Sequence, residues 1–182
     1  APYVAYVDRV NGGKVTVMKF NGSSWVTVGS AGFTAGEAEY IDFEFDANGT
    51  PFVAYMDYAH ENKASVMKFD GSAWVNIGLA GFTTGFAQHF SLMLDSNGTP
   101  YIAYGDGAIG AKATVSKFDG REWVPVGAAG FSVGEVYSPS LALDAGGTPF
   151  VSYIDREEEG RAVVKRFDGS SWVIVGTASF SN

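Results

Sequence analysis

The chain has 182 residues, no cysteine, two histidines, and 20 acidic against 12 basic side chains, which gives a formal net charge of −8. Without cysteine it is neither a disulfide scaffold nor a thiol enzyme nor a Cys-ligated zinc protein. Its acidity argues against a nucleic-acid partner, because phosphate binding needs a basic surface. No apolar run reaches the roughly 18 residues that a membrane-spanning helix needs.

An internal repeat of 49 residues organises the whole chain. Four residue types recur at this spacing: Trp25, Trp74, Trp123 and Trp172; Tyr6, Tyr55, Tyr104 and Tyr153; Pro2, Pro51, Pro100 and Pro149; Gly22, Gly71, Gly120 and Gly169. A fixed period of this length predicts a repeat architecture. We therefore expect residues 1–182 to form a single repeat domain, with copies at approximately 1–36, 37–85, 86–134 and 135–182.

Each copy contains four short runs of β-branched and aromatic residues, which predict strands. In one copy these strands cover residues 90–95, 100–106, 112–118 and 122–126. The Asn97-Gly98 pair between the first two predicts a type I′ hairpin turn, in which both central residues have positive φ. The Asp119-Gly120 pair between the last two is similar hairpin chemistry. No sustained 3.6-residue apolar period occurs, so we expect no helix.

Four antiparallel strands per repeat, joined by two hairpins and one long connection, predict a blade of a β-propeller. We label the strands a to d from the inside outward. Strand a is expected only at about 40–46, 90–95 and 138–144. The predicted fold class is therefore all-β: a β-propeller with four repeats of four-stranded antiparallel blades, the first blade lacking its inner strand.

The whole chain resembles a tandem-repeat β-propeller. Its turn and tryptophan, as in Phe69-Asp70-Gly71-Ser72-Ala73-Trp74, are similar to the Asp-box in the c to d hairpin of sialidase-like propellers. That family has one residue between Asp and Gly, whereas this chain has none. The resemblance implies an architecture and no activity. It also implies a structural role in the turn for Asp70, Asp119 and Asp168.

The incomplete first blade leaves closure of the ring open. The chain begins at Ala1 and not at Met, so we expect a processed form or an excised segment. Three alternatives follow: the remaining blades belong to a longer parent chain, partner chains complete the ring by self-association, or a ring tolerates one three-stranded blade. Two chains forming an eight-bladed ring would bury both open ends.

One face of the predicted propeller carries the candidate site. The b to c loops and the d to a connections emerge on this variable face, and their sequences differ between copies, whereas the opposite hairpin face is nearly identical from copy to copy. Loops on a rigid scaffold often carry binding residues, although neutral drift in exposed loops is the alternative. The candidate ligand-binding residues are Tyr40, Tyr58, His60, Phe86, His89, Tyr137, Glu37 and Glu135.

Aromatic rings that stack on sugars, with polar groups nearby, favour a non-catalytic, lectin-like module that binds a glycan or a protein. The alternatives are a structural or adhesin repeat of a longer extracellular array, and a glycoside hydrolase that uses two carboxylates from Glu37, Glu39, Asp42 and Glu135. No nucleophile motif supports an enzyme. The absence of cysteine, the acidic surface and the repetition suit a secreted or cell-surface protein.

Calcium is the cofactor that the acidic residues suggest. An aspartate ends strand b in every copy: Asp8, Asp57, Asp106 and Asp155. Together with Glu37 and Glu135 these could supply the oxygen ligands that Ca²⁺ prefers. The alternative is that each aspartate caps a turn or pairs with the basic residue six positions later, Lys14, Lys63, Lys112 or Arg161. Two histidines are too few for a zinc site.

Overall fold

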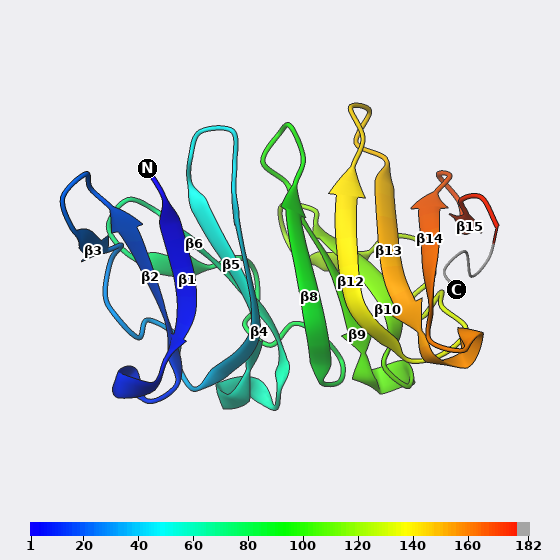
Figure 1. Cartoon of the computed structure of the whole chain (residues 1–182), viewed down its shortest axis with the longest axis horizontal. Helices are drawn as coiled ribbons and strands as arrows, with labels where there is room; N and C mark the ends of the chain where they lie inside the picture. Colours follow the sequence, from blue (N-terminus) through cyan, green and yellow to red (C-terminus); the bar gives the residue numbers. More distant parts are fainter. Residues whose placement is uncertain (178–182) are drawn as a thin grey trace.

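The computed structural model describes residues 1–177, which form fifteen β-strands and four short 3₁₀ turns (Figure 1). The first sheet contains β1 (Tyr3–Asp8), β2 (Lys14–Phe20) and β3 (Trp25–Thr27). The second contains β4 (Ala38–Phe45), β5 (Pro51–Asp57), β6 (Lys63–Phe69) and β7 (Trp74–Asn76). The third contains β8 (Ala87–Leu94), β9 (Pro100–Asp106), β10 (Lys112–Phe118) and β11 (Trp123–Pro125). The fourth contains β12 (Val136–Leu143), β13 (Pro149–Asp155), β14 (Arg161–Phe167) and β15 (Trp172–Ile174).

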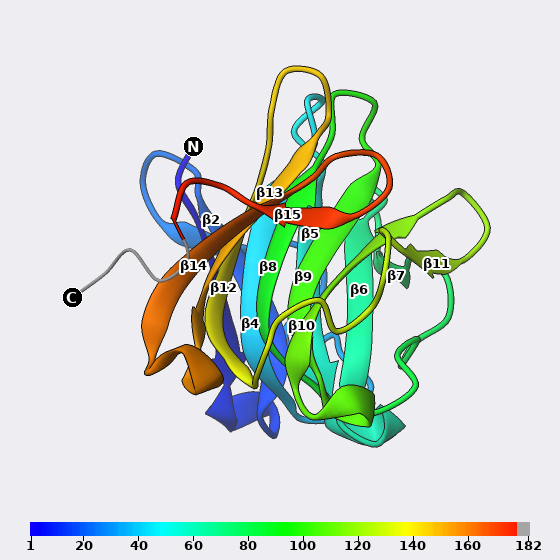
Figure 2. The same cartoon turned by 90° about the vertical axis from the view of Figure 1, so that its right-hand side faces the viewer.

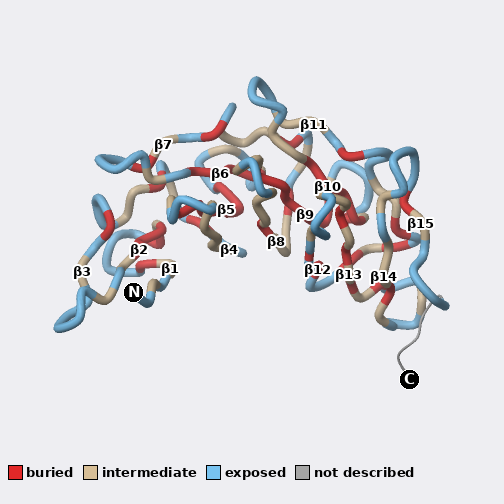
Figure 3. The backbone as a smooth tube through the Cα atoms, turned by 90° about the horizontal axis from the view of Figure 1, so that it is seen from above, coloured by how far each residue is buried: buried red, intermediate tan, exposed pale blue. Residues whose placement is uncertain are grey.

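Every strand pairs antiparallel with its neighbour in sequence, so each sheet is a simple meander. Seen from above, the four sheets follow one another along an arc, with β4, β8 and β12 on its concave side and the first and fourth sheets at its opposite ends (Figure 3). The fold is an open β-propeller. The prediction of four blades, the first without its inner strand, is confirmed.

The two faces of the arc carry different connections. Figure 2 shows the hairpins at the top and the 3₁₀ turns at the bottom. The 3₁₀ turns are η1 (Arg9–Asn11), η2 (Tyr58–His60), η3 (Gly107–Ile109) and η4 (Arg156–Glu158), one in each b to c loop. The expectation of no helix therefore missed these single turns, which are too short to produce a periodic sequence pattern.

The a to b hairpins have a different turn from the predicted type I′. Gly49 has φ of +80°, but Asn48 is not among the residues with positive φ. The Gly49 N–H donates to the Asp46 carbonyl at 3.0 Å, and the Asp46 carboxylate accepts from the Asn48 and Thr50 N–H groups. These bonds close a turn in which the aspartate side chain supplies the acceptors, so only the glycine needs the left-handed region.

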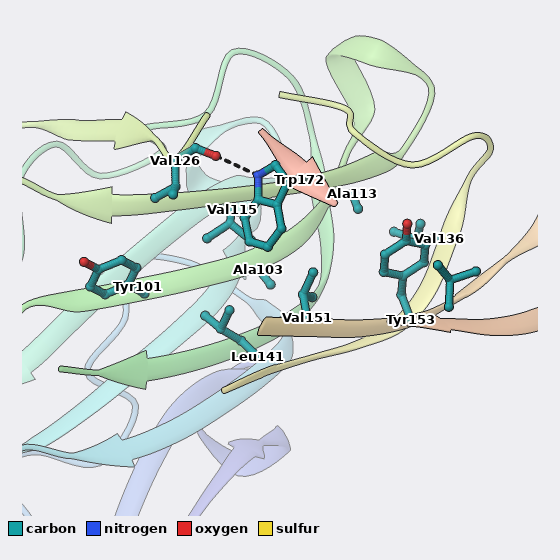
Figure 4. Close-up of a cluster of buried hydrophobic side chains, with 11 residues drawn as sticks. Tyr101, Ala103, Ala113, Val115, Val126, Val136, Leu141, Val151, Tyr153 and Trp172 are labelled. Atoms are coloured by element: carbon teal, nitrogen blue, oxygen red, sulfur yellow. Dashed lines mark hydrogen bonds between the residues drawn. The ribbon is translucent and has the colours of Figure 1, made fainter. Parts of the chain in front are cut away.

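The core lies between neighbouring sheets. Between the third and fourth sheets, Tyr101, Ala103 and Val115 pack against Val151 and Trp172 (Figure 4). Equivalent clusters fill the other two junctions. Each junction is also joined by an indole N–H that donates to a carbonyl of the preceding sheet at 2.8 Å: Trp74 to Val28, Trp123 to Ile77 and Trp172 to Val126. The propeller is therefore held together by a repeated side-chain interface and not by backbone pairing between sheets.

The c to d turns confirm that Asp70, Asp119 and Asp168 are turn residues. The Asp70 carboxylate accepts from the N–H groups of Ser72 and Ala73, both at 2.8 Å. Its two counterparts accept in the same way. Hydrogen bonds from the Ser171 and Ser170 N–H groups lower the pKa of Asp168 to about 2, because they favour the charged form.

Candidate functional site

Buried aspartates at the ends of the b strands build the variable face. Asp57 is fully buried, and its carboxylate caps η2 by accepting from the Ala59 N–H at 3.0 Å and from the Ser65 hydroxyl at 2.8 Å. Ser65 in turn accepts from the Gly81 N–H at 2.8 Å. This chain of bonds fixes the 3₁₀ turn and the d to a connection to the same sheet, and it recurs in the first and third sheets through Thr16 and Thr114.

The structure does not bring the four aspartates together as a calcium site. Asp8, Asp57 and Asp106 each serve their own 3₁₀ turn and hydroxyl, whereas Asp155 accepts from the Val133, Gly134 and Glu157 N–H groups. Two of the basic residues that follow six positions later pair with other acidic residues: Lys63 pairs with Glu61, and Arg161 pairs with Glu159. Within residues 1–177 no group of three or more acidic or histidine side chains could hold a metal ion. The geometry gives the aspartates the capping role.

The inner strands begin earlier than predicted and contain a bulge. β8 starts at Ala87, three residues before the predicted start at Phe90. Its register with β9 shifts between Gln88 and Ser91, and equivalent shifts occur in β4 and β12. The residue in the bulge has positive φ each time: +47° at Tyr40, +56° at His89 and +48° at Ser138. Positive φ in a bulky residue costs about 1–2 kcal/mol, and such strain concentrates at functional sites.

The bulges bring three predicted residues into one row along the inner strands. The ring centroids of Tyr40 and His89 are 4.7 Å apart, and those of His89 and Tyr137 are 5.6 Å apart, with interplanar angles of 58° and 67°. Tyr40 and Tyr137 are 41% and 36% exposed. We call Tyr40, His89 and Tyr137 the aromatic row. Because each residue comes from a different sheet, the row crosses both junctions between the second, third and fourth sheets.

Charged and polar side chains surround the aromatic row. Glu135 forms a 2.9 Å ion pair with Arg156, and this bond holds the pKa of Glu135 below its ordinary value. Tyr137 and Gln88 also help to lower the pKa of Glu135. At the other end, a hydrogen bond to Glu39 raises the pKa of Tyr58. Burial lowers the pKa of His89, and the charge of Glu135 opposes that shift.

The remaining predicted ligand-binding residues lie outside the row. Glu37 lies beside Gly13, where an added Cβ would be 2.8 Å from its side chain, and Phe86 covers Gly107 in the same way. His60 bonds to Asp57 at 2.8 Å and lines a hollow of about 200 Å³ together with side chains of the second sheet and of the connections before and after it. No signal in the sequence indicates that Gln88 and Arg156 are neighbours of Glu135, since their proximity depends on how adjacent blades are placed.

Two observations bear on the glycoside hydrolase alternative. The Asp42 carboxylate accepts from the Leu92 N–H at 2.7 Å and from the Phe43 N–H at 2.9 Å. It therefore links two inner strands. Glu135 is engaged by Arg156. Asp42 and Glu135 thus have structural partners, and Glu39 interacts with Tyr58.

The hairpin face has shallow hollows beside the c to d hairpins. In the third sheet the hollow measures about 440 Å³ and is lined by residues 95, 97–101 and 117–120. Similar hollows lie at the same place in the other three sheets. They are lined largely by turn residues that repeat in every copy, so they follow from the hairpin geometry itself.

No protein-family model matches the chain, and no curated protein matches it significantly. Solved structures share its fold. A variant of the Aleuria aurantia lectin in complex with Fucα1-6GlcNAc superposes with a TM-score of 0.65 at 16% identity, over 99% of this chain and 60% of that one. This chain thus spans 60% of the length of that lectin.

Two further structures show how varied the proteins with this fold are. A fucose lectin from Kordia zhangzhouensis, in complex with methyl-fucoside, gives a TM-score of 0.52 at 15% identity, over 76% of this chain and 99% of that one. An endo-1,4-β-xylanase from Bacteroides thetaiotaomicron gives 0.53 at 12% identity, over 97% and 75%. At these identities the similarity establishes the fold alone. No helix within residues 1–177 is long and apolar enough to cross a membrane.

Proposed function

We propose that this chain is a non-catalytic carbohydrate-binding module and that it binds a glycan at the aromatic row. The single observation that carries the proposal is the row itself: the exposed rings of Tyr40 and Tyr137 with the half-buried ring of His89 between them, beside the Glu135–Arg156 pair. Tyr40 and His89 are held in the left-handed region. Sugar sites combine flat apolar groups with a few oriented polar groups. Tyr40 and Tyr137 supply the first, and Glu135 and Arg156 supply acceptors and donors for hydroxyl groups.

The comparisons support a sugar as the ligand class. Among the proteins that share the fold, those from Aleuria aurantia and Kordia zhangzhouensis bind fucosides. A glycan that extends along the row would contact three blades at once, so weak contacts would add up through multivalency. This function suits a secreted or cell-surface location, which remains a prediction.

The test is binding of the labelled chain to a glycan array that includes fucosylated glycans. Tyr40→Ala and His89→Ala should each lower the affinity about fivefold or more, since a stacked ring contributes about 1 kcal/mol or more. Phe86→Ala is the matched control, because Phe86 is an exposed ring on the same face that packs on Gly107 and not in the row. It should bind like the unmodified chain.

Three outcomes decide the proposal. Binding that is lost in the two row variants and kept in the control supports both the ligand class and the site. Equal binding by all variants would move the site to another surface. An array on which the chain binds no glycan would overturn the proposed function and favour a protein ligand or a structural repeat.

A further inference from the structure

Consecutive sheets of the chain pack against each other through the same kind of interface at three junctions. The first and fourth sheets each carry one side of this interface at an end of the arc. Inside the arc, each sheet presents one surface to the sheet before it and another to the sheet after it. In the first sheet, no sheet within residues 1–177 covers the surface that would face a preceding sheet. We define this head edge as Val4, Tyr6 and Trp25. In the fourth sheet no sheet within the described residues covers the surface that would face a following sheet, and we define this tail edge as Phe150, Val164 and Val175.

The head edge is exposed only because no described sheet precedes it. Val4 is 40% exposed, whereas its counterparts Val53, Ile102 and Val151 are 0%, 0% and 1% exposed. Trp25 is 46% exposed, against 8% for Trp74. The residue types are those that fill the three internal junctions, so burial of this edge would again remove apolar surface from water.

The tail edge shows the same contrast. Val175 is 38% exposed, whereas its counterparts Val28, Ile77 and Val126 are 7%, 8% and 8% exposed. Its N–H donates to the Val164 carbonyl at 2.9 Å, the same bond that Val126 makes to Val115. The carbonyls of Val28, Ile77 and Val126 each accept from a tryptophan of the next sheet. Val175 occupies the equivalent position in the fourth sheet.

We propose that the head edge of one copy of this chain binds the tail edge of a second copy, with the Trp25 indole N–H donating to the Val175 carbonyl of the other copy. The second copy is the occupant because the interface already exists in the chain between each pair of consecutive sheets. Unlike surfaces meet in this contact, so it is heterologous and can close into a ring when the rotation allows. The inference is independent of the proposed function.

The first experiment is light scattering on the full 182-residue chain over a dilution series. The expected mass is two or more times 19.3 kDa at high concentration, falling toward 19.3 kDa on dilution. A chain that stays at 19.3 kDa at every concentration overturns the proposal.

Matched charge substitutions then locate the contact. Val4→Asp and Val175→Asp should each abolish association, because each places a charge in the apolar interface. Val10→Asp and Ile174→Asp add the same charge at positions that are 95% and 46% exposed and lie outside both edges. These two controls should associate like the unmodified chain.

Mixing the two edge variants tests the direction of the contact. Val4→Asp retains an intact tail and Val175→Asp an intact head, so the mixture should form a two-chain complex although neither variant associates alone. A head-to-head contact would instead leave Val175→Asp associated, and a tail-to-tail contact would leave Val4→Asp associated; either result overturns the proposal. Far-UV circular dichroism verifies that both variants fold.

Discussion

The indole N–H of Trp74 donates a 2.8 Å hydrogen bond to the carbonyl of Val28, in the preceding sheet. The same ring stacks on Phe33 from the connection between the two sheets, with centroids 4.3 Å apart and planes within 7°. Both contacts recur at the next two junctions. One tryptophan per repeat therefore joins consecutive sheets by a polar and an apolar contact.

Replacing this tryptophan should loosen the propeller. Trp74→Phe removes the indole N–H, so the Val28 carbonyl loses this hydrogen bond. We expect the free energy of unfolding to fall by about 2 kcal/mol. Denaturant unfolding measures the change, since a lower midpoint with an unchanged slope reports a loss of stability.

Trp25 provides the control, because its sheet has no described sheet before it and its ring is 46% exposed. Trp25→Phe should change the stability by less than about 0.5 kcal/mol. Both substitutions are compared in the Val175→Asp background, in which no contact between copies contributes. Equal losses for Trp74 and Trp25 would contradict the role given to the bond between sheets.

The blade architecture could be predicted because it depends on local signals that repeat. Glycine at each turn and tryptophan at each fourth strand fix where strands begin and end, and a 49-residue period makes the same signals recur. The turn type could not be predicted from Asn48-Gly49 alone. The acceptor that decides it is the Asp46 side chain, two residues before Asn48.

The candidate site was predicted only in part. The residue types of Tyr40, His89 and Tyr137 pointed to a binding surface, but His89 and Tyr137 were expected in connections, whereas they lie in β8 and β12. A bulge shifts the register by one residue without a sequence signature of its own. That three blades bring these rings together depends on how the sheets pack, which no single repeat encodes.

The positive φ of Tyr40 makes a further prediction. Tyr40→Ala and Tyr40→Gly both remove the ring, and they differ mainly in the cost of φ at +47°. Glycine adopts this region without a steric penalty, so the Gly variant should be about 1 kcal/mol more stable than the Ala variant. Denaturant unfolding of the two variants measures the difference.

Tyr137 is the matched position, since it belongs to the same row but is not among the residues with positive φ. Within an ordinary strand glycine is the weaker residue. Tyr137→Gly should therefore be less stable than Tyr137→Ala. The same order at both positions would show that the Tyr40 bulge carries no strain.

His89 should titrate below its ordinary pKa of 6.5, because burial disfavours the imidazolium. Nuclear magnetic resonance can follow the two histidines, and the signal that His89→Gln removes identifies His89. Glu135→Gln removes the charge that opposes the shift, so the pKa of His89 should fall further. An unchanged or higher value would contradict the described packing.

The same shift sets a dependence of stability on pH. The unfolded chain binds the His89 proton at a higher pH than the folded chain, so folding is disfavoured once protonation begins. The contribution of His89 to stability should be present above pH 6.5 and decline as the pH falls through 6.5 toward the folded value. His89→Gln should remove this part of the dependence, as thermal unfolding at several pH values would show.

The last prediction separates capping from calcium binding at the strand-end aspartates. Asp57 is fully buried and accepts from the Ala59 N–H, the Ser65 hydroxyl and His60. Asp57→Ala should therefore lower the free energy of unfolding by about 2 kcal/mol. Glu122→Ala, at an exposed acidic residue of the hairpin face, should change the free energy of unfolding by less than about 0.5 kcal/mol.

Thermal unfolding of the unmodified chain should be the same with added Ca²⁺ and with EDTA, because the carboxylate oxygens already accept hydrogen bonds from the protein. A midpoint that Ca²⁺ raises and Asp57→Ala makes insensitive to Ca²⁺ would instead assign these aspartates to a metal.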